Sequence, residues 1–587
     1  MEVDPTLVPH LHLRAFAEEL ANCGVEVVAT SPGSRNTPLL LALNGEPRLR
    51  CYSLIDERAA AFFALGAAKA SGKAAVAVCT SGTAAANFYP AAVEADQAGV
   101  PLLLLTADRP AELRECGAGQ TIDQLKLFGS AVRFFFELEL TPDLSGLGYV
   151  RELACRAYAL AAKYKPGPVQ INFPLRDPLV YDRPLPQPPG GRGGKPQLRF
   201  CRPQGGAALP ADLCHAFADA RRPLIVAGRL EGSPTYQRRQ GEGVAAFAAA
   251  LGIPLFADPL SWARRPPTAI SHYDALLRVE PLAQRLIPDL VLRVGALPTS
   301  KPLRRWLAVV GGRQMAIHPH GEVHDPDRVV ELVVEADPAA VLSPFQCGGG
   351  ADPSWLGELK ELDQAASRCL RELVGNGFSE LAAVDSLWNL LPAEATVLVS
   401  SSMPVRDAEL LWQARDRPPR VLANRGANGI DGTVATALGV CAACPGEKVV
   451  ALIGDVALAH DLSGLAAAGR LGLDLTVVLI DNGGGAIFDL LPVAHSGEAA
   501  AIYEQQVATP TEIQTAALAQ AVGFNYLEAA SGEELRAALE GALAGRGPTL
   551  IRLSFPRANA VGLRREVAHR LQRALEAVGA ADRQGTA

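Results

Sequence analysis

Residues 446–492 read GEKVVALIGDVALAHDLSGLAAAGRLGLDLTVVLIDNGGGAIFDLLP, and they predict a strand, a helix and a second strand joined by turns. The first strand ends at Gly454-Asp455, and the second ends at Asp481-Asn482, before a run of three glycines. Because ligands bind outside the carboxyl ends of strands in open α/β sheets, Asp455 and Asn482 are candidate site residues. The alternative is an aspartate N-cap and a glycine-rich turn in an ordinary βαβ unit.

The residue types at these two strand ends suit a hard cation beside a phosphate. Mg²⁺ takes oxygen ligands, usually one or two from the protein and the rest from phosphate and water. Asp455 and Asn482 offer side-chain oxygens, and the glycines at 483–485 let a backbone carbonyl and a diphosphate approach without a Cβ between them. The stretch therefore indicates a metal and diphosphate site.

Length and composition describe a globular chain of several domains. At 587 residues it is long enough for about three or four domains, and a hydrophobic content of 49% with 20% charge is ordinary for such proteins. A net charge of −7 is too mild to indicate nucleic-acid or anionic-membrane binding. We find no signal-peptide pattern and no apolar run of about 20 residues. Eleven scattered cysteines suit reduced thiols, so we expect a cytoplasmic protein without a membrane span.

Alternating helix and strand patterns predict an α/β protein of three doubly wound, parallel-sheet domains, because apolar strands separated by helices are covered on both faces. Residues 183–197, rich in proline and glycine, predict a linker, and a second break is expected at Ser343–Pro353. Disorder is expected for Ala580–Ala587. The expected domains are residues 1–182, 198–345 and 355–579. The strands expected in the first two are Val25–Thr30, Arg50–Ile55, Ala74–Thr80, Pro101–Thr106, Val169–Phe173, Leu224–Gly228, Pro254–Ala257, Leu290–Gly295 and Gln314–His318.

Several basic side chains follow predicted strands. Ser34-Arg35 comes after the first strand and before a helix, where backbone N–H groups favour anions and a guanidinium can hold a carboxylate. Taken singly, each cation is more simply a surface charge. Five of them, all at strand ends, predict a pocket for a substrate with several carboxylates. These five residues are Arg35, Arg109, Lys301, Arg406 and Arg425.

Glu57, in DER at residues 56–58, follows the second predicted strand and opens a helix. A carboxylate there often only compensates the helix dipole. However, the Gly-Asp and Asn spacing of residues 446–492 resembles the metal and diphosphate signature of the thiamine diphosphate enzymes, with Val456 where the commonest versions have glycine. That signature has a glutamate partner in a separate N-terminal domain, and TSGTA at residues 80–84 also resembles this superfamily. The resemblance implies that Glu57 hydrogen-bonds the aminopyrimidine ring and activates the cofactor.

The motifs resemble one branch of this superfamily closely. Residues 10–555 contain, in family order and spacing, SPGSR, DER, TSGTA, LTADRP, SKP, NRGANGIDG, GD and NGGGAIF. This is similar to the 2-succinyl-5-enolpyruvyl-6-hydroxy-3-cyclohexene-1-carboxylate synthases of menaquinone and phylloquinone biosynthesis. The resemblance implies a thiamine diphosphate-binding fold, with thiamine diphosphate and Mg²⁺ or Mn²⁺ as cofactors. It also implies decarboxylation of 2-oxoglutarate followed by 1,4-addition to isochorismate. Gly119 and Pro302 stand where some members have Asn and Arg.

The same resemblance assigns roles to individual residues. Asp455, Asn482 and the carbonyl of Gly484 would bind the metal. Residues implied in cofactor binding are Glu57, Ser402, Ile430, Gly454, Asp455, Asn482, Gly484, Ile487 and Phe488. Residues implied in substrate binding are Ser34, Arg35, Arg109, Gln120, Lys301, Arg406 and Arg425. Residues implied in catalysis are Glu57, Gln120, Ser402, Arg406 and Arg425.

Two other functions fit the fold. Another thiamine diphosphate carboligase, such as an acetohydroxyacid synthase, would handle acids with one carboxylate and would need fewer basic side chains. A non-catalytic thiamine-binding protein would not need Glu57, Asp455 and Asn482 together. The family resemblance also implies a homodimer or homotetramer whose active sites form between the N-terminal domain of one subunit and the C-terminal domain of another.

Overall fold

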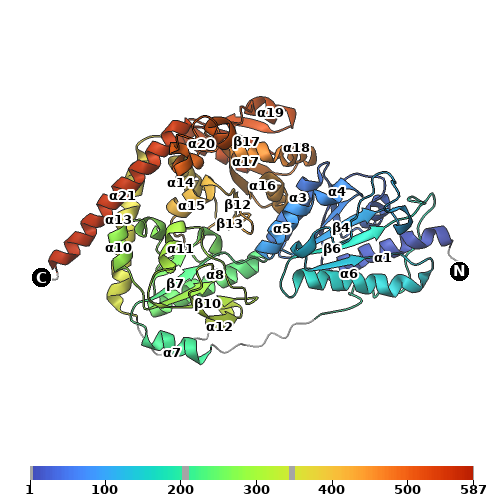
Figure 1. The fold of residues 1–587 in the computed structure, drawn as a ribbon, viewed down its shortest axis with the longest axis horizontal. Helices are drawn as coiled ribbons and strands as arrows, with labels where there is room; N and C mark the ends of the chain where they lie inside the picture. Colours follow the sequence, from blue (N-terminus) through green and yellow to red (C-terminus); the bar gives the residue numbers. More distant parts are fainter. Residues whose placement is uncertain (1–3, 201–209, 343–350, 586–587) are drawn as a thin grey trace.

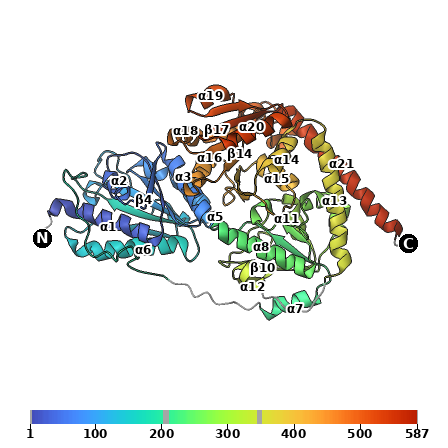
Figure 2. The ribbon, with the colours of Figure 1, turned by 180° about the vertical axis from the view of Figure 1, so that it is seen from behind.

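The computed structural model describes residues 4–200, 210–342 and 351–585. It contains three parallel β-sheets, each flanked by helices and each lying within one of the three predicted segments, so the predicted fold class is confirmed. The N-terminal domain lies at one end of the molecule, and the middle and C-terminal domains lie together at the other (Figures 1 and 2). No helix in the described ranges is long and apolar enough to cross a membrane.

The N-terminal sheet has six strands in the order β2-β1-β3-β4-β6-β5. Its strands are β1 (Val27–Thr30), β2 (Arg50–Ser53), β3 (Ala75–Cys79), β4 (Leu102–Asp108), β5 (Phe134–Glu137) and β6 (Pro168–Pro174). Its helices are α1 (Val8–Cys23), α2 (Thr37–Asn44), α3 (Glu57–Ser71), α4 (Thr83–Ala86), α5 (Tyr89–Ala98) and α6 (Leu147–Ala162). Strands β3, β4 and β6 are buried along their whole length, which explains their unbroken apolar sequences.

The middle sheet has five strands in the order β11-β10-β9-β7-β8. Its strands are β7 (Pro223–Ala227), β8 (Leu255–Ala257), β9 (Leu290–Val294), β10 (Arg313–His318) and β11 (Val330–Glu335). Its helices are α7 (Ala211–Asp219), α8 (Pro234–Leu251), α9 (Tyr273–Leu276), α10 (Glu280–Arg285), α11 (Lys301–Leu307) and α12 (Pro338–Leu342). The predicted break at Ser343–Pro353 falls largely on residues outside the described ranges, and the domain boundaries themselves stay predictions.

The C-terminal sheet has six strands in the order β13-β12-β14-β15-β17-β16. Its strands are β12 (Thr396–Val399), β13 (Arg420–Leu422), β14 (Val449–Gly454), β15 (Leu475–Asp481), β16 (Asn525–Glu528) and β17 (Thr549–Ser554). Its helices are α13 (Pro353–Gly375), α14 (Glu380–Leu390), α15 (Met403–Leu411), α16 (Thr433–Ala443), α17 (Asp455–His460), α18 (Leu462–Leu471), α19 (Thr515–Ala521), α20 (Gly532–Ala544) and α21 (Arg557–Gly585). The expectation of disorder from Ala580 onward is wrong as far as Gly585, because α21 continues to that residue.

Two edge strands of the first two sheets were missing from the sequence prediction, which also named no strand of the C-terminal domain outside residues 446–492. Strand β5, Phe134–Glu137, and strand β11, Val330–Glu335, each close one side of a sheet. Both are only partly buried, unlike the central strands. An edge strand has a neighbour on one side only, so its sequence need not carry the continuous apolar run by which the central strands were recognised.

Helices α3 and α16 join the N-terminal and C-terminal domains within the chain, and their side chains share one apolar core. Their close approach depends on Gly66, because a Cβ at this residue would lie 1.9 Å from the carbonyl oxygen of Thr436. Polar contacts continue this interface beside the N-terminus of α3. Arg58 donates to the carbonyl of His460 at 2.9 Å, and Ser463 donates to Asp56 at 2.6 Å. The helix that begins at Glu57 is therefore fixed against the C-terminal domain.

Candidate active site

The three predicted metal ligands meet where β14 and β15 end. These strands pair in parallel, with Gly454 opposite Ile480, so the residues that follow each strand lie side by side. Asp455 is the first residue of α17, and its carboxylate accepts a 2.6 Å hydrogen bond from the N–H of Gly484. Gly484 has φ +127°, and a Cβ there would lie 2.7 Å from the carbonyl of Ala508. Only glycine fits this close turn.

Asn482 presents an oxygen that has no partner among the described residues. Its side-chain nitrogen donates to Glu380 at 2.8 Å, which leaves Oδ1 buried and without a hydrogen bond. A buried polar atom without a partner is costly unless something else binds it. An amide oxygen beside a carboxylate suits a hard divalent cation, so the donor atoms at this position fit the metal that the sequence predicted.

Asp455 is held in a position that disfavours its negative charge. Only 4% of the residue is exposed, and burial raises the pKa of its carboxyl group to about 6. Hydrogen bonds from the N–H groups of Gly484 and Val456 lower this pKa, whereas the nearby negative charge of Asp481 raises it further. A cation bound to this carboxylate would offset the cost of its burial.

These groups lie in a cavity of about 350 Å³ in the C-terminal domain. Apolar side chains of Ile430, Ile487 and Phe488 form part of its wall, beside the polar groups of Asp455 and Asn482. The sequence-predicted residues that line the cavity are Ser402, Arg406, Arg425, Ile430, Gly454, Asp455, Asn482, Gly484, Ile487 and Phe488. Sequence-predicted residues separated by as many as 86 positions, from Ser402 to Phe488, are thus brought into one cavity.

Ser402 has an unusual backbone conformation at the wall of this cavity. It precedes α15 with φ +76° and ψ −135°, a region that residues other than glycine rarely adopt. Such strain costs of order 1–3 kcal/mol and persists only where the surrounding structure enforces it, most often at functional sites. The sequence signalled Ser402 only through family resemblance, and the strain is an independent indication of function.

Two guanidinium groups enter the same cavity. Arg406 donates to the carbonyl of Ser402, and Arg425 donates to Ser401 Oγ at 3.3 Å. Burial lowers the pKa of Arg425, and the nearby Arg406 and Arg229 act in the same direction. Neighbouring cations that repel one another favour an anionic ligand between them.

A second group of predicted residues lies at the carboxyl ends of the N-terminal strands. Asn87 donates to Glu57 at 3.2 Å, while Gln120 and Ser81 exchange hydrogen bonds of 3.0 and 2.9 Å. Arg35 and Arg109 lie near each other: burial lowers the pKa of Arg35, and Arg109 contributes to the decrease. Ser34 precedes Arg35 in the same loop after β1.

The structure does not bring all the predicted residues into one cavity. Glu57, Gln120 and the other N-terminal residues, Ser34, Arg35 and Arg109, are not among those that line the cavity around Asp455. Lys301 is exposed at the start of α11 in the middle domain, also outside it. Within one chain, the predicted site residues therefore lie in three places: the cavity around Asp455, the N-terminal strand ends, and Lys301 in the middle domain.

Sequence reasoning missed the residues that hold Asn482. The carboxylate of Glu380 on α14 accepts a hydrogen bond from the side-chain amide of Asn482. It also accepts one from the guanidinium of Arg564 on α21, at 2.8 Å. Arg564 binds Asp407 as well, at 2.6 Å. Glu380 and Arg564 lie far from Asn482 in sequence and carry no motif of their own, so no local pattern could have identified them.

Comparison with known families agrees with this geometry. Three profiles match successive parts of the chain: the N-terminal TPP binding domain of thiamine pyrophosphate enzymes at residues 13–127, the middle domain at 209–399 and the C-terminal TPP binding domain at 406–553. Thiamine pyrophosphate is another name for thiamine diphosphate. The profiles support thiamine diphosphate as the cofactor. They also place cofactor binding in two of the three domains, the N-terminal and the C-terminal one.

Similar curated proteins share one name, 2-succinyl-5-enolpyruvyl-6-hydroxy-3-cyclohexene-1-carboxylate synthase. The one from Geobacillus kaustophilus is 40% identical over 594 residues, covering 96% of this chain and 99% of its own. The relative from Geobacillus thermodenitrificans is 41% identical and covers 88% of each chain. The relative from Halobacterium salinarum is 39% identical and covers 93% of this chain and 95% of its own. These names support the synthase over an acetohydroxyacid synthase. The chain therefore belongs to the thiamine diphosphate-dependent 2-succinyl-5-enolpyruvyl-6-hydroxy-3-cyclohexene-1-carboxylate synthases, a family of transferases.

Proposed function

We propose that this synthase decarboxylates 2-oxoglutarate, adds the succinyl semialdehyde carbanion equivalent to isochorismate, and serves menaquinone or phylloquinone biosynthesis. The products would be 2-succinyl-5-enolpyruvyl-6-hydroxy-3-cyclohexene-1-carboxylate and CO₂. The observation that carries this proposal is the cavity in which Arg406 and Arg425 lie beside Asp455 and the free oxygen of Asn482. Both proposed substrates carry two carboxylates, which suits a cavity with more than one guanidinium group.

A mass-spectrometric assay tests this function. The protein is incubated with 2-oxoglutarate, isochorismate, thiamine diphosphate and Mg²⁺, and the adduct mass and CO₂ release are followed together. Pyruvate replaces 2-oxoglutarate in a parallel reaction. We expect the adduct from 2-oxoglutarate. A protein that instead joined two molecules of pyruvate would be an acetohydroxyacid synthase in activity, contrary to the proposal.

The metal is proposed to be Mg²⁺ or Mn²⁺, held by Asp455, Asn482 Oδ1 and the carbonyl of Gly484. The buried Oδ1 of Asn482, which has no partner within residues 4–200, 210–342 and 351–585, and the burial of Asp455 support this choice. Thiamine diphosphate, when bound, supplies the carbanion chemistry of the reaction. The protein's part would be to hold the diphosphate through the metal, to pack Ile430, Ile487 and Phe488 against the cofactor, and to exchange a proton with its aminopyrimidine ring through Glu57.

Glu380 should determine how well the metal binds. Its carboxylate accepts the amide N–H of Asn482 and thereby leaves Oδ1 facing the cavity. A glutamine at this position can donate as well as accept, so Glu380→Gln would no longer fix which end of the Asn482 amide faces the metal. We expect Mg²⁺ affinity to fall by roughly 10–100-fold, as for other losses of outer ligand support. Calorimetry with saturating thiamine diphosphate measures this, and Glu394→Gln, whose side chain is 73% exposed, is the control. Unchanged affinity in Glu380→Gln would remove this role.

At least one of the basic side chains should make the protein prefer 2-oxoglutarate to pyruvate as the oxoacid that it decarboxylates. We expect at least one of them to bind the distal carboxylate of 2-oxoglutarate, which pyruvate lacks. Its replacement by alanine should then lower decarboxylation of 2-oxoglutarate more than that of pyruvate. The variants to compare are Arg35→Ala, Arg109→Ala, Lys301→Ala, Arg406→Ala and Arg425→Ala. Arg417→Ala, at a side chain that is 79% exposed, is the control. The pocket interpretation is wrong if all five variants keep the wild-type ratio of rates.

The active site is proposed to be shared between subunits of a homodimer or homotetramer. Glu57 lies outside the cavity that contains Asp455, although both must reach one cofactor molecule. Large apolar side chains are exposed near both halves: Ile55 is 75% exposed beside Glu57, and Leu490, Leu491 and Ile502 follow the cavity wall at Phe488. Exposed apolar groups of this kind are typical of surfaces that a partner covers.

Subunit complementation tests the shared site. Inactive Glu57→Gln and inactive Asp455→Ala proteins are mixed under conditions that exchange subunits. In a mixed dimer one site would carry both substitutions and the other neither, so part of the wild-type activity should return. Exchange is verified with differently tagged subunits, and light scattering gives the assembly state. A monomeric wild type, or verified exchange without recovered activity, would contradict the shared site.

A further inference from the structure

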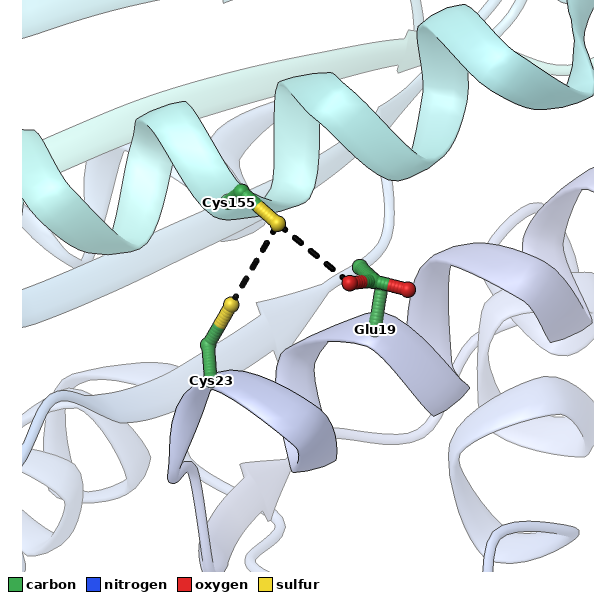
Figure 3. Close-up of side chains that lie close together, drawn as sticks. All are labelled: Glu19, Cys23 and Cys155. Atoms are coloured by element: carbon green, nitrogen blue, oxygen red, sulfur yellow. Dashed lines mark hydrogen bonds between the residues drawn. The ribbon is translucent and has the colours of Figure 1, made fainter. Parts of the chain in front are cut away.

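Two thiols and a carboxylate converge in the N-terminal domain, where helices α1 and α6 pack together. Glu19 and Cys23 lie one helical turn apart on α1, and Cys155 of α6 faces both of them (Figure 3). The two sulfur atoms are 3.6 Å apart, and Cys155 Sγ is 3.3 Å from Glu19 Oε1. All three potential ligand atoms lie within 4.8 Å of one another. Glu19 and Cys155 are only 1% and 2% exposed, whereas Cys23 is partly exposed.

The two distances from Cys155 Sγ, to Cys23 Sγ and to Glu19 Oε1, are near those between ligands of one metal ion. Two thiolates at about 2.3 Å from a tetrahedral Zn²⁺ are roughly 3.8 Å apart, and a thiolate and a carboxylate oxygen are roughly 3.5 Å apart. The distances of 3.6 and 3.3 Å are close to these values. A disulfide would require the two sulfur atoms to approach to about 2.05 Å. The thiols therefore lie nearer to metal-ligand geometry than to disulfide geometry.

Hydrogen-bond donors already surround two of these ligands, Cys155 and Glu19. The backbone N–H of Leu198 donates to Cys155 Sγ at 3.4 Å, and that of Gln197 donates to Glu19 Oε1. Arg151, which is 1% exposed, binds the other carboxylate oxygen of Glu19 at 3.2 Å. Such outer contacts orient metal ligands and stabilise their anionic forms.

We propose that Cys23, Cys155 and Glu19 form a binding site for one borderline-soft divalent cation, with Zn²⁺ as the expected ion. Binding exchanges the two thiol protons for the cation, and water completes the tetrahedron on the partly exposed side of Cys23. The bound ion links α1 to α6 next to residues 197 and 198, whose N–H groups contact Glu19 and Cys155 of the N-terminal domain. The site is separate from the cavity around Asp455, which lies in the C-terminal domain, and its role is structural.

Metal analysis of the reduced protein tests this site. Wild type, the double variant Cys23→Ser with Cys155→Ser, and Cys51→Ser, a partly buried thiol elsewhere in the same domain, are equilibrated with Zn²⁺ in excess Mg²⁺. We expect wild type and Cys51→Ser to retain one more Zn²⁺ per chain than the double variant. With Co²⁺ in place of Zn²⁺, a thiolate-to-cobalt charge-transfer band should appear in wild type and be lost in the double variant.

Thiol alkylation of the wild type gives a second measurement that needs no variant to fold. Zn²⁺ should protect Cys23 and Cys155 from alkylation, and a chelator should expose them again. Equal zinc content in all three proteins, or alkylation unaffected by Zn²⁺, would overturn the proposal. A cross-linked peptide pair containing Cys23 and Cys155, with a mass two hydrogens below the sum of the two reduced peptides, would instead identify a disulfide in the zinc-treated protein. That result would also overturn the proposal.

Discussion

Replacing Glu57 with Gln should slow proton exchange at C2 of bound thiamine diphosphate by at least about 100-fold, the usual effect of losing a proton-transfer group. Glu57 is the carboxylate at the start of α3 and accepts a hydrogen bond from Asn87. The carbonyl of a glutamine can still accept that hydrogen bond, so the helix and its packing on α16 should be kept. The substitution removes the ability to share a proton while it leaves the fold intact.

Deuterium exchange of the bound cofactor, measured by nuclear magnetic resonance after acid quenching, gives this rate directly. Glu139→Gln is a suitable control, because its side chain is in the same domain and 60% exposed. Calorimetry should show that Glu57→Gln still binds Mg²⁺ with the cofactor. If exchange proceeded at the wild-type rate, Glu57 would have no part in activation, and the shared-site proposal would lose its main support.

Replacing Asp455 with Ala should weaken the binding of metal and diphosphate together, because one cation bridges the two. The carboxylate also accepts the N–H groups of Gly484 and Val456, so its loss loosens the glycine turn as well as removing a ligand. We expect thiamine diphosphate affinity in Mg²⁺ to fall by at least about 100-fold, above the range seen for outer-ligand changes.

Titration calorimetry with and without Mg²⁺ separates the two effects. Asp455→Asn keeps the shape of the side chain and a hydrogen-bond acceptor but removes the negative charge. If the charge is what holds the cation, this variant should also bind Mg²⁺ and thiamine diphosphate weakly. Glu540→Ala, at a side chain 67% exposed on α20, controls for general changes in the same domain. Wild-type cofactor affinity in Asp455→Ala would place the metal and diphosphate elsewhere in the molecule.

The parts of the site that could be predicted from the sequence are those encoded locally. The Gly-Asp at the end of β14 and the Asn after β15 were recognisable because a buried strand, a turn and a polar residue follow one another along the chain. Parallel pairing of β14 with β15 then brings Asp455 and Asn482 together without further information. The same reasoning placed five cations at strand ends, of which Arg406 and Arg425 line this cavity and the other three do not.

Other parts depend on contacts that no local pattern encodes. Glu380 reaches Asn482 from a helix 102 positions earlier, and the positive φ of Ser402 is set by the packing around it. The separation of Glu57 from the Asp455 cavity within one chain is also a tertiary property, which the family resemblance implied and the order of the motifs does not encode. Edge strands β5 and β11 were missed because partial burial relaxes the apolar pattern that marks a strand.

The contact between Arg564 and Glu380 has a consequence for how the protein is made. All residues that line the cavity have been synthesised by Phe488, yet the carboxylate that orients Asn482 is itself held by an arginine 76 positions later. A nascent chain that still lacks α21 therefore has a complete set of ligands but an unfixed amide. The amide of Asn482 is therefore fixed only after α21 has been made and has packed against the C-terminal domain, so residues outside the motifs set the moment at which the metal site is complete.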